Sequence, residues 1–309
     1  MTYPTVVLKK AAEQLKKRQE ENKQITREKK EKAYIEIPEL REINKKIGAL
    51  VKLGVASETN VSDVKKALRD LVIERETLLL EKGYPKNYLE DYYECPLCKD
   101  EGFVGSEPCE CYKKLIRAEA YKLSNLSGRI DKENFSNFSL SIHSEQKYME
   151  CITEKAKRYC QMDSTIKNNL LFTGPTGTGK TFLSSCIAKE FLDSGHFVLY
   201  LTATKISNII DDAKFRHEKP EHEEYLAMIN DCDLLIIDDL GTEYAFGYPQ
   251  SQLFDILENR MLLGKRTVIS TNMDLNELNQ KYSPRLVSRI LGNYDIFVFR
   301  GDDVRYQNG

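Results

Sequence analysis

The stretch "GPTGTGKT", residues 174–181, constrains the fold of this 309-residue chain more than any other feature. It follows the apolar run "NLLF" and precedes "TFLSSCIAKEFLDSG", whose apolar spacing predicts a helix. A strand before and a helix after are the context in which G-x-x-x-x-G-K-[S/T] binds phosphates. Glycines let the backbone wrap closely with its N–H groups turned inward, and the helix N-terminus adds partial positive charge. The stretch therefore predicts a loop that holds a nucleoside triphosphate.

The whole loop is assigned to the nucleotide site. We expect Lys180 to reach the β- and γ-phosphates and the Thr181 hydroxyl to take a place on Mg²⁺. The assigned residues are Gly174, Pro175, Thr176, Gly177, Thr178, Gly179, Lys180 and Thr181.

A second apolar run, "LLIIDDL", ends in two carboxylates about 60 residues after the lysine. Asp238 is predicted to hold Mg²⁺, and Asp239 to act as the base that orients the attacking water. The next run, "RTVIST", ends at Asn272, whose amide can bond the attacking water or the γ-phosphate. Arg285 and Arg289 follow, one helical turn apart, and an arginine near a subunit edge can stabilise charge on a neighbour's nucleotide.

From about residue 148, strand-like and helical patterns alternate. The strand-like runs are "NLLFTG", "HFVLYLTA", "CDLLIIDDL", "RTVISTN" and "YDIFVF". Such alternation predicts an α/β fold with a parallel sheet and helices on both faces. Only 37 residues follow Asn272, too few for a helical lid of several helices, so we expect a core without a lid.

The N-terminal part has a different pattern. Residues 5–34 permit a helix, and two amphipathic stripes, from Leu40 to Gly54 and from Val64 to Leu78, predict further helices. Residues 1–33 carry ten Lys or Arg against five Glu, although the whole chain has a net charge of only −2. Such a basic arm either is a solvated helix face or meets nucleic acid or an acidic protein.

Four cysteines form a spaced group, Cys95-x2-Cys98-x10-Cys109-x-Cys111. Paired cysteines around a turn-rich loop predict a structural zinc site in which four thiolates close the coordination. The alternative is a set of free thiols in a core, which the prolines and glycines between them disfavour. Cys151, Cys160, Cys186 and Cys232 stand singly and are interpreted as small apolar residues.

These patterns predict three regions. They are a helical and zinc-binding N-terminal domain at 1–123, a polar linker at 124–147 and a P-loop domain at 148–309. No apolar run approaches the length of a membrane span and the first residues lack a signal peptide, so we expect a cytoplasmic protein without a membrane partner.

The motifs "GPTGTGKTFL", "LLIIDDLG", "STN" and "LVSRILG", in this order, resemble those of the AAA+ ATPases that load bacterial replicative helicases, the DnaC/DnaI type. The transposase-helper ATPases of the IstB type share the same core. The resemblance covers about 135–309 strongly and the N-terminal half more loosely.

The resemblance implies a role for several residues. Asp238 and Asp239 fall on the magnesium and catalytic positions, and Asn272 falls on the sensor position. Arg289 matches the arginine finger that acts in trans, and Arg305 matches the C-terminal arginine that contacts the γ-phosphate in cis. Family members usually carry Asp-Glu where this chain has Asp-Asp, a difference that bears on the rate of hydrolysis and not on nucleotide binding.

The resemblance also implies ligands and partners. Single-stranded DNA is the family's expected ligand, and Phe215 and Tyr248 are the predicted stacking contacts because cations or glycines flank them. The expected cofactors are ATP, Mg²⁺ and Zn²⁺, and the expected partners are a hexameric replicative helicase and further copies of the chain.

Two functions remain open on the sequence. The first is an ATP-hydrolysing loader of the replicative helicase onto single-stranded DNA during the initiation of replication. The second is a transposase helper, or an ATP-gated DNA-binding adaptor. The zinc segment favours the loader, because loaders of the DnaI kind carry such a domain and transposase helpers generally lack it. A small-molecule kinase fits poorly, because nothing after Asn272 resembles a lid for an acceptor.

Overall fold

The computed structural model describes residues 3–56, 61–126, 128–129, 131–140, 145–162, 167–212, 220–243, 248–301 and 303. The chain divides into two compact units. The N-terminal unit comprises residues 12–113, and the sheet unit comprises residues 1–11 with 114–309. Each unit is described by itself.

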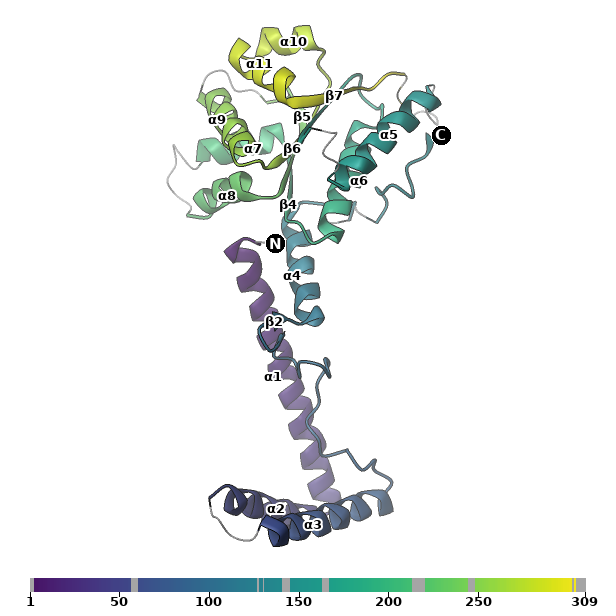
Figure 1. The fold of residues 1–309 in the computed structure, drawn as a ribbon, viewed down its shortest axis with the longest axis vertical. Helices are drawn as coiled ribbons and strands as arrows, with labels where there is room; N and C mark the ends of the chain where they lie inside the picture. The colour runs from purple at the N-terminus through teal and green to yellow at the C-terminus, as the bar shows by residue number, and fades with distance from the viewer. Residues whose placement is uncertain are drawn as a thin grey trace. The chain divides into compact units, whose positions relative to one another are not determined.

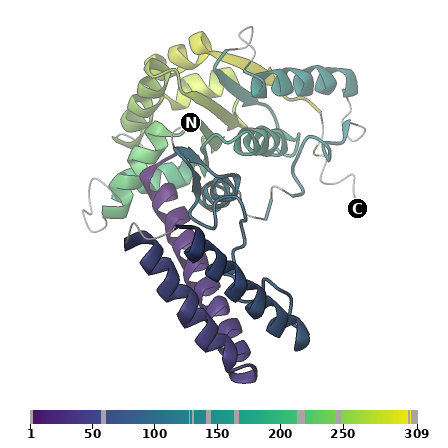
Figure 2. The same cartoon turned by 60° about the horizontal axis from the view of Figure 1, so that its bottom comes forward.

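The N-terminal unit consists of helices and a short hairpin. Helices α2 and α3 lie side by side (Figure 2), and strands β1 and β2 pair antiparallel, with Phe103 opposite Pro108. A small apolar cluster of Ala33, Ile37, Leu40, Leu79 and Leu89 joins α1 to this helix pair. The elements are α1 (Thr5–Glu36), α2 (Glu39–Ala56), α3 (Val61–Glu81), β1 (Phe103–Val104), β2 (Glu107–Pro108) and the beginning of α4 (Glu110–Leu123). Helix α2 runs two residues beyond Gly54, where the sequence predicted its end.

The sheet unit is built on a five-stranded sheet in the order β4-β5-β6-β3-β7, and all neighbouring strands are parallel. Its strands are β3 (Asn169–Thr173), β4 (Val198–Thr202), β5 (Leu234–Leu240), β6 (Arg266–Thr271) and β7 (Tyr294–Val298). Each of the five strand-like runs of the sequence forms one of these strands. Strand β3 is buried along its whole length, as a central strand covered on both faces must be.

Helices cover both faces of this sheet (Figure 1). Helices α5 and α6 lie on one face, and α7, α8 and α9 lie on the other. Helix α11 packs beside β7 and contacts α10. The helices are α5 (Gln146–Cys160), α6 (Lys180–Asp193), α7 (Ala203–Asp211), α8 (Pro220–Asp231), α9 (Tyr248–Leu262), α10 (Leu275–Lys281) and α11 (Pro284–Asn293).

The predicted fold class is confirmed. A P-loop α/β core with a parallel sheet and helices on both faces follows a helical region that contains the clustered cysteines. Between α11 and residue 301, the described chain forms β7 and no further helix. The domain boundaries at 123 and 147 stay predictions; α5 begins at Gln146 and α4 ends at Leu123. In the part of the chain that the structure describes, none of the helices is long and apolar enough to cross a membrane.

Candidate nucleotide site and cysteine cluster

The loop between β3 and α6 follows a path that favours glycine at three positions, and at two of them a side chain would also collide with another segment. Gly174 has φ +137° and Gly177 has φ +79°. A Cβ atom on Gly174 would lie 2.1 Å from the carbonyl oxygen of Phe299, and one on Gly177 would lie 1.9 Å from Cγ of Asp303. Because both neighbours belong to the segment that follows β7, the loop is held closely against that segment. A side chain at either glycine would displace it.

Lys180 is buried at the first position of α6 and lies over its own loop. Its ammonium group donates to the carbonyl oxygens of Gly174 at 2.7 Å and Pro175 at 2.6 Å. The Thr178 hydroxyl also donates to the Pro175 carbonyl, at 2.8 Å. The loop is therefore braced by internal hydrogen bonds, and a cation is already placed within it.

Asp238, near the end of β5, is the centre of a buried hydroxyl cluster. The Thr181 hydroxyl donates to its Oδ1 at 3.2 Å, and the Tyr200 hydroxyl donates to its Oδ2 at 2.7 Å. The Ser270 hydroxyl from β6 also donates to Oδ1. The structure thus brings together Thr181 and Asp238, the two residues predicted to hold Mg²⁺, and adds two residues that the sequence analysis missed.

Tyr200 remains a donor in this cluster because burial, followed by the charge of Asp238, raises the pKa of its phenol well above the ordinary 10.0. The guanidinium of Arg129 lies over the Tyr200 ring, 5.3 Å from its centroid, and pairs with Glu133 at 3.2 Å. Strand register explains how Tyr200 reaches Asp238: Thr202 of β4 lies opposite Asp238, so Tyr200 is only two residues away on the neighbouring strand, and no local pattern in the sequence marks this pairing.

A register shift between Ile237 and Leu240 interrupts β5 at the two carboxylates. Asp239 has φ +55°, a left-handed conformation that aspartate tolerates better than most residues, and its N–H donates to the Ser270 hydroxyl at 3.0 Å. The shift lets Asp238 stay buried while Asp239 lines the pocket above the loop.

The pocket has a volume of about 350 Å³, and the glycine loop, Asp239 and Asn272 line it together. Glu133 lines it as well, from the segment that the sequence analysis treated as a linker. No local motif marks Glu133 in the sequence. The structure therefore places both residues predicted to act on water, Asp239 and Asn272, beside Lys180 and Thr181.

Arg289 is not among the described residues that line this pocket. It lies on α11, half exposed, and its guanidinium donates to Glu258 of α9 at 3.0 Å. Arg285, one turn earlier, pairs with the other oxygen of Glu258 at 3.7 Å and lies over the ring of Phe254. The role of Arg289 in trans stays a prediction.

Three predicted residues fall outside what the structure describes. Arg305 and Phe215 lie outside the described residues. Tyr248 is the first residue of α9, and its side chain is not described. The proposed γ-phosphate contact and both proposed DNA contacts therefore stay predictions.

The four spaced cysteines of the N-terminal unit converge. All four sulfur atoms lie within 4.8 Å of one another, with Cys95 and Cys109 at 3.7 Å and Cys98 and Cys111 at 3.4 Å. A tetrahedral zinc–thiolate site with bonds of about 2.3 Å has sulfur atoms about 3.8 Å apart, so these thiols fit zinc. The cluster could hold such an ion as a closed, structural site.

Asp100 stabilises the segment that carries the four cysteines, residues 95–111, which we call the cysteine turn. Its buried carboxylate accepts from the N–H groups of Glu94 at 2.9 Å and Cys95 at 3.0 Å, and from the Asn22 amide at 2.9 Å. Arg18 donates to the Cys111 sulfur at 3.5 Å and pairs with Asp100 at 3.4 Å. The turn is thus tied to α1, which carries both Arg18 and Asn22.

The thiols differ in acidity. Hydrogen bonds, first that from the Cys98 backbone, lower the pKa of the Cys95 thiol to about 7, whereas burial raises the pKa of Cys111 to about 12. A metal ion must displace the protons of all four thiols, so binding would be weaker at low pH.

Comparisons with known proteins relate this chain to a family of ATP-binding proteins. A family model described as "IstB-like ATP binding protein" matches residues 138–308. The "Replicative helicase loader DnaC" of Escherichia coli (strain K12) is 25% identical over 210 residues, which are 67% of this chain and 83% of that protein.

Solved structures show weaker likeness. The "Crystal structure of the DnaC helicase loader" has 20% identity and a TM-score of 0.48, over 56% of this chain and 100% of that chain. The AMPPCP-bound DnaA of Aquifex aeolicus has 23% identity and a TM-score of 0.45, over 57% of this chain and 53% of that one. The alignment thus spans about half of the DnaA chain.

Proposed function

The chain belongs to the family of IstB-like ATP-binding proteins, and from this premise we propose that it is an ATP-hydrolysing loader of the replicative DNA helicase onto single-stranded DNA. The observation that carries the proposal is the convergence of Lys180, Thr181, Asp239 and Asn272 on one pocket, with Asp238 buried behind it. The relative named as a DnaC helicase loader supports the choice of this function over others.

Nucleotide binding would use groups that are now paired with one another. The Lys180 ammonium would exchange the carbonyls of Gly174 and Pro175 for phosphate oxygens, which carry more negative charge. Thr181 and Asp238 would hold Mg²⁺, which neutralises charge on the phosphates when bound. Tyr200 and Ser270 would keep the Asp238 carboxylate oriented.

Hydrolysis would depend on two residues of the pocket lining, Asp239 and Asn272. Asp239 would accept a proton from the attacking water, and Asn272 would orient that water. Aspartate reaches one methylene less far than the glutamate usual at this position, but the register shift of β5 places Asp239 in the pocket lining. Arg289 would act on the nucleotide of a neighbouring copy, because it lies on α11, outside its own pocket lining.

The N-terminal unit would bind the helicase, with the cysteine cluster holding one structural zinc ion. Its four converging thiols, tied to α1 through Asp100, would fix the shape of this unit. The second candidate, a transposase helper, is favoured by the description of the matching family model. A zinc-binding N-terminal unit favours the loader.

The test is affinity capture with the full chain, ATP and two purified baits, a hexameric replicative helicase and an IS21-type transposase. We expect the helicase to be retained and single-stranded DNA to stimulate ATP hydrolysis. Lys180→Ala serves as the control that removes the nucleotide site and leaves the N-terminal unit unchanged. Retention of the transposase alone would overturn the loader assignment.

A further inference from the structure

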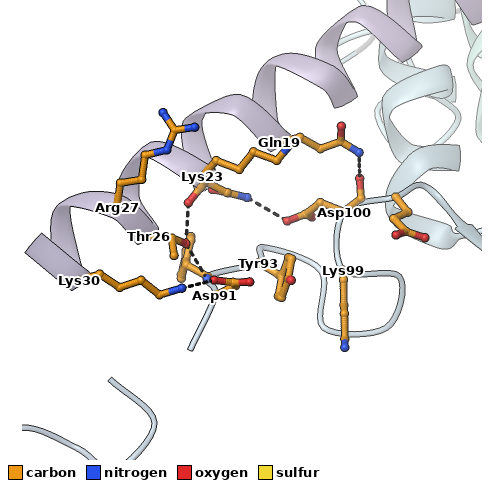
Figure 3. A pocket seen from close by; sticks show the side chains of 12 residues that line it. Gln19, Lys23, Thr26, Arg27, Lys30, Asp91, Tyr93, Lys99 and Asp100 are labelled. Carbon is orange, nitrogen blue, oxygen red and sulfur yellow. Dashed lines mark hydrogen bonds and ion pairs between the residues drawn. The ribbon is translucent and has the colours of Figure 1, made fainter. Parts of the chain in front are cut away.

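A second pocket, of about 540 Å³, lies within the N-terminal unit, where no function has yet been assigned to it. One wall is a face of α1, and the other is formed by residues 91–93 and 99–101 (Figure 3). This part of α1 belongs to the basic arm that the nucleotide site leaves unexplained.

The floor of the pocket is buried, and its polar groups are bonded to one another. The Thr26 hydroxyl donates to the Asn22 carbonyl at 2.9 Å and accepts from the Tyr92 N–H at 2.9 Å. The Asn22 amide donates to Asp100, and Gln19 donates to the Asp100 carbonyl at 2.8 Å (Figure 3). The segment that carries the tyrosines is therefore fixed against α1, and the pocket is formed before any ligand arrives.

Two of the acidic residues in the lining are already neutralised. Asp91 pairs with Lys30 at 2.6 Å. Asp100 is 1% exposed and is satisfied by the N–H groups of the cysteine turn, Asn22 and Arg18. The negative charges of both carboxylates are thus largely offset, and they repel an incoming anion less strongly than free carboxylates would.

Three cations of the lining have no such partner. Lys23, Arg27 and Lys99 are exposed, and no hydrogen bond or ion pair joins the side chain of any of them to another described residue. Only Glu101 among the lining acids remains to offset them. Lys23 and Arg27 are four residues apart on α1 and thus about 6 Å apart along its axis. Lys23 and Arg27 on α1 and Lys99 on the opposite wall thus surround the pocket with three unpaired cations against one remaining acid, Glu101.

Two aromatic rings accompany these cations. Tyr92 and Tyr93 are 42% and 39% exposed, in a segment outside any helix or strand. Ring faces held in water beside lysine and arginine are the elements from which proteins build sites for single strands, because bases stack on the rings and phosphates pair with the cations.

We propose that this pocket binds single-stranded nucleic acid, with Lys23, Arg27 and Lys99 contacting phosphates and Tyr92 and Tyr93 stacking on bases. An acidic peptide would also pair with the three cations, but its carboxylates would not stack on the two exposed rings. The site lies wholly in the N-terminal unit and does not depend on the nucleotide pocket or on the proposed loading activity.

The charge test uses the full chain without nucleotide and a fluorescein-labelled oligothymidylate, with anisotropy measured over a range of salt concentrations. The triple variant Lys23→Gln, Arg27→Gln, Lys99→Gln removes three phosphate contacts. We expect the slope of log K against log [salt] to fall by about 2, and affinity at 0.1 M salt to fall by up to about 100-fold.

The matched control is Lys65→Gln, Lys66→Gln, Arg69→Gln. These three residues are exposed on α3 of the same unit and also lack an ion pair with a described residue. The control removes the same net charge and should leave affinity and slope close to those of the parent. Equal losses in the two variants, or no loss in either, would overturn the proposal.

The stacking test separates nucleic acid from an acidic peptide. Tyr92→Ala with Tyr93→Ala should weaken oligothymidylate binding about 30-fold or more, whereas Tyr92→Phe with Tyr93→Phe should keep it, because phenylalanine retains the ring face. A strand containing 5-iododeoxyuridine should crosslink to the peptide that carries residues 91–99. Crosslinks confined to the sheet unit, or a polyglutamate peptide that binds the pocket where the oligonucleotide does not, would overturn the proposal.

Discussion

The nucleotide loop and the cysteine turn are both short, turn-rich segments that surround a prospective ligand, yet they are held in different ways. The loop sits between β3 and α6, on a sheet whose strands β3, β5 and β6 are almost wholly buried, and its lysine donates to carbonyls of the loop itself. The turn is held by the two-residue strands β1 and β2, by hydrogen bonds to Asp100 and by the bond from Arg18 to Cys111.

This difference predicts whether each segment keeps its shape when its ligand leaves. A loop that a packed sheet holds in place keeps its shape when nucleotide leaves, as a site that must exchange its ligand requires. A turn with so little apolar burial depends on the ion that its thiols would share. The cysteine turn should therefore unfold when its metal is removed, whereas the nucleotide loop should keep its shape when ATP leaves.

The largest expected effect follows from this contrast. Removing zinc with a chelator, or replacing Cys98 by Ser, should unfold the segment around residues 90–115, because binding of about 10 kcal/mol or more is coupled to folding in such sites. Hydrogen exchange should rise there and remain slow in the strands of the sheet. Cys151→Ser, at an exposed cysteine of α5, is the control. Freshly purified, reduced protein without one equivalent of zinc would contradict the assignment.

The next effect concerns Arg289 and appears only when copies of the chain meet. Arg289→Ala should leave the ATP affinity of an isolated subunit intact and lower hydrolysis in the assembly by about 10³-fold, the effect expected of a finger supplied in trans. Arg285→Ala is the matched control, because Arg285 lies on the same helix and pairs with the same Glu258.

Mixing variants sharpens that test. In mixed assemblies, a Lys180→Ala subunit can supply its intact Arg289 to the intact nucleotide site of an Arg289→Ala subunit, and activity should partly return. If the mixture co-assembles and stays as inactive as either variant alone, Arg289 has a structural role instead, such as its bond to Glu258.

A third effect distinguishes the carboxylates of the nucleotide pocket. Asp239→Asn should keep ATP bound and slow hydrolysis by about 10²- to 10⁴-fold, because the general base is lost while Asp238 remains. Glu133→Gln is the control, since Glu133 lines the same pocket. Rapid-quench measurements of a single turnover would separate binding from chemistry. If Glu133→Gln slows turnover and Asp239→Asn does not, the base belongs to Glu133.

The sequence predicted the parts of this molecule that local patterns encode. Apolar runs predicted all five strands, and the loop motif predicted the strand before it, β3, and the helix after it, α6. The spacing of the four cysteines likewise predicted their convergence.

What the sequence could not predict depends on contacts between distant segments. Tyr200 and Ser270 reach Asp238 from two neighbouring strands, and Glu133 enters the pocket from a polar segment without a motif. The left-handed conformation of Asp239 arises from a register shift, which no spacing in the chain encodes.

The smallest effect tests one of these unforeseen contacts. Tyr200→Phe removes the hydroxyl that donates to Asp238 at 2.7 Å, and Tyr159→Phe removes a comparable hydroxyl that donates to the Asn168 carbonyl at 3.0 Å. Each loss should lower the free energy of unfolding by about 1 kcal/mol. Only Tyr200→Phe should also weaken Mg²⁺-dependent ATP binding, by about tenfold, because it loosens a residue proposed to hold the ion.

The measurement pairs chemical denaturation with titration of ATP at several Mg²⁺ concentrations. The raised pKa of Tyr200 keeps its hydroxyl protonated at neutral and mildly alkaline pH, so the tenfold difference should persist across that range. Equal stability losses with equal ATP affinities would mean that Tyr200 only fills the core. In that case the hydroxyls of Thr181 and Ser270 would be enough to orient Asp238.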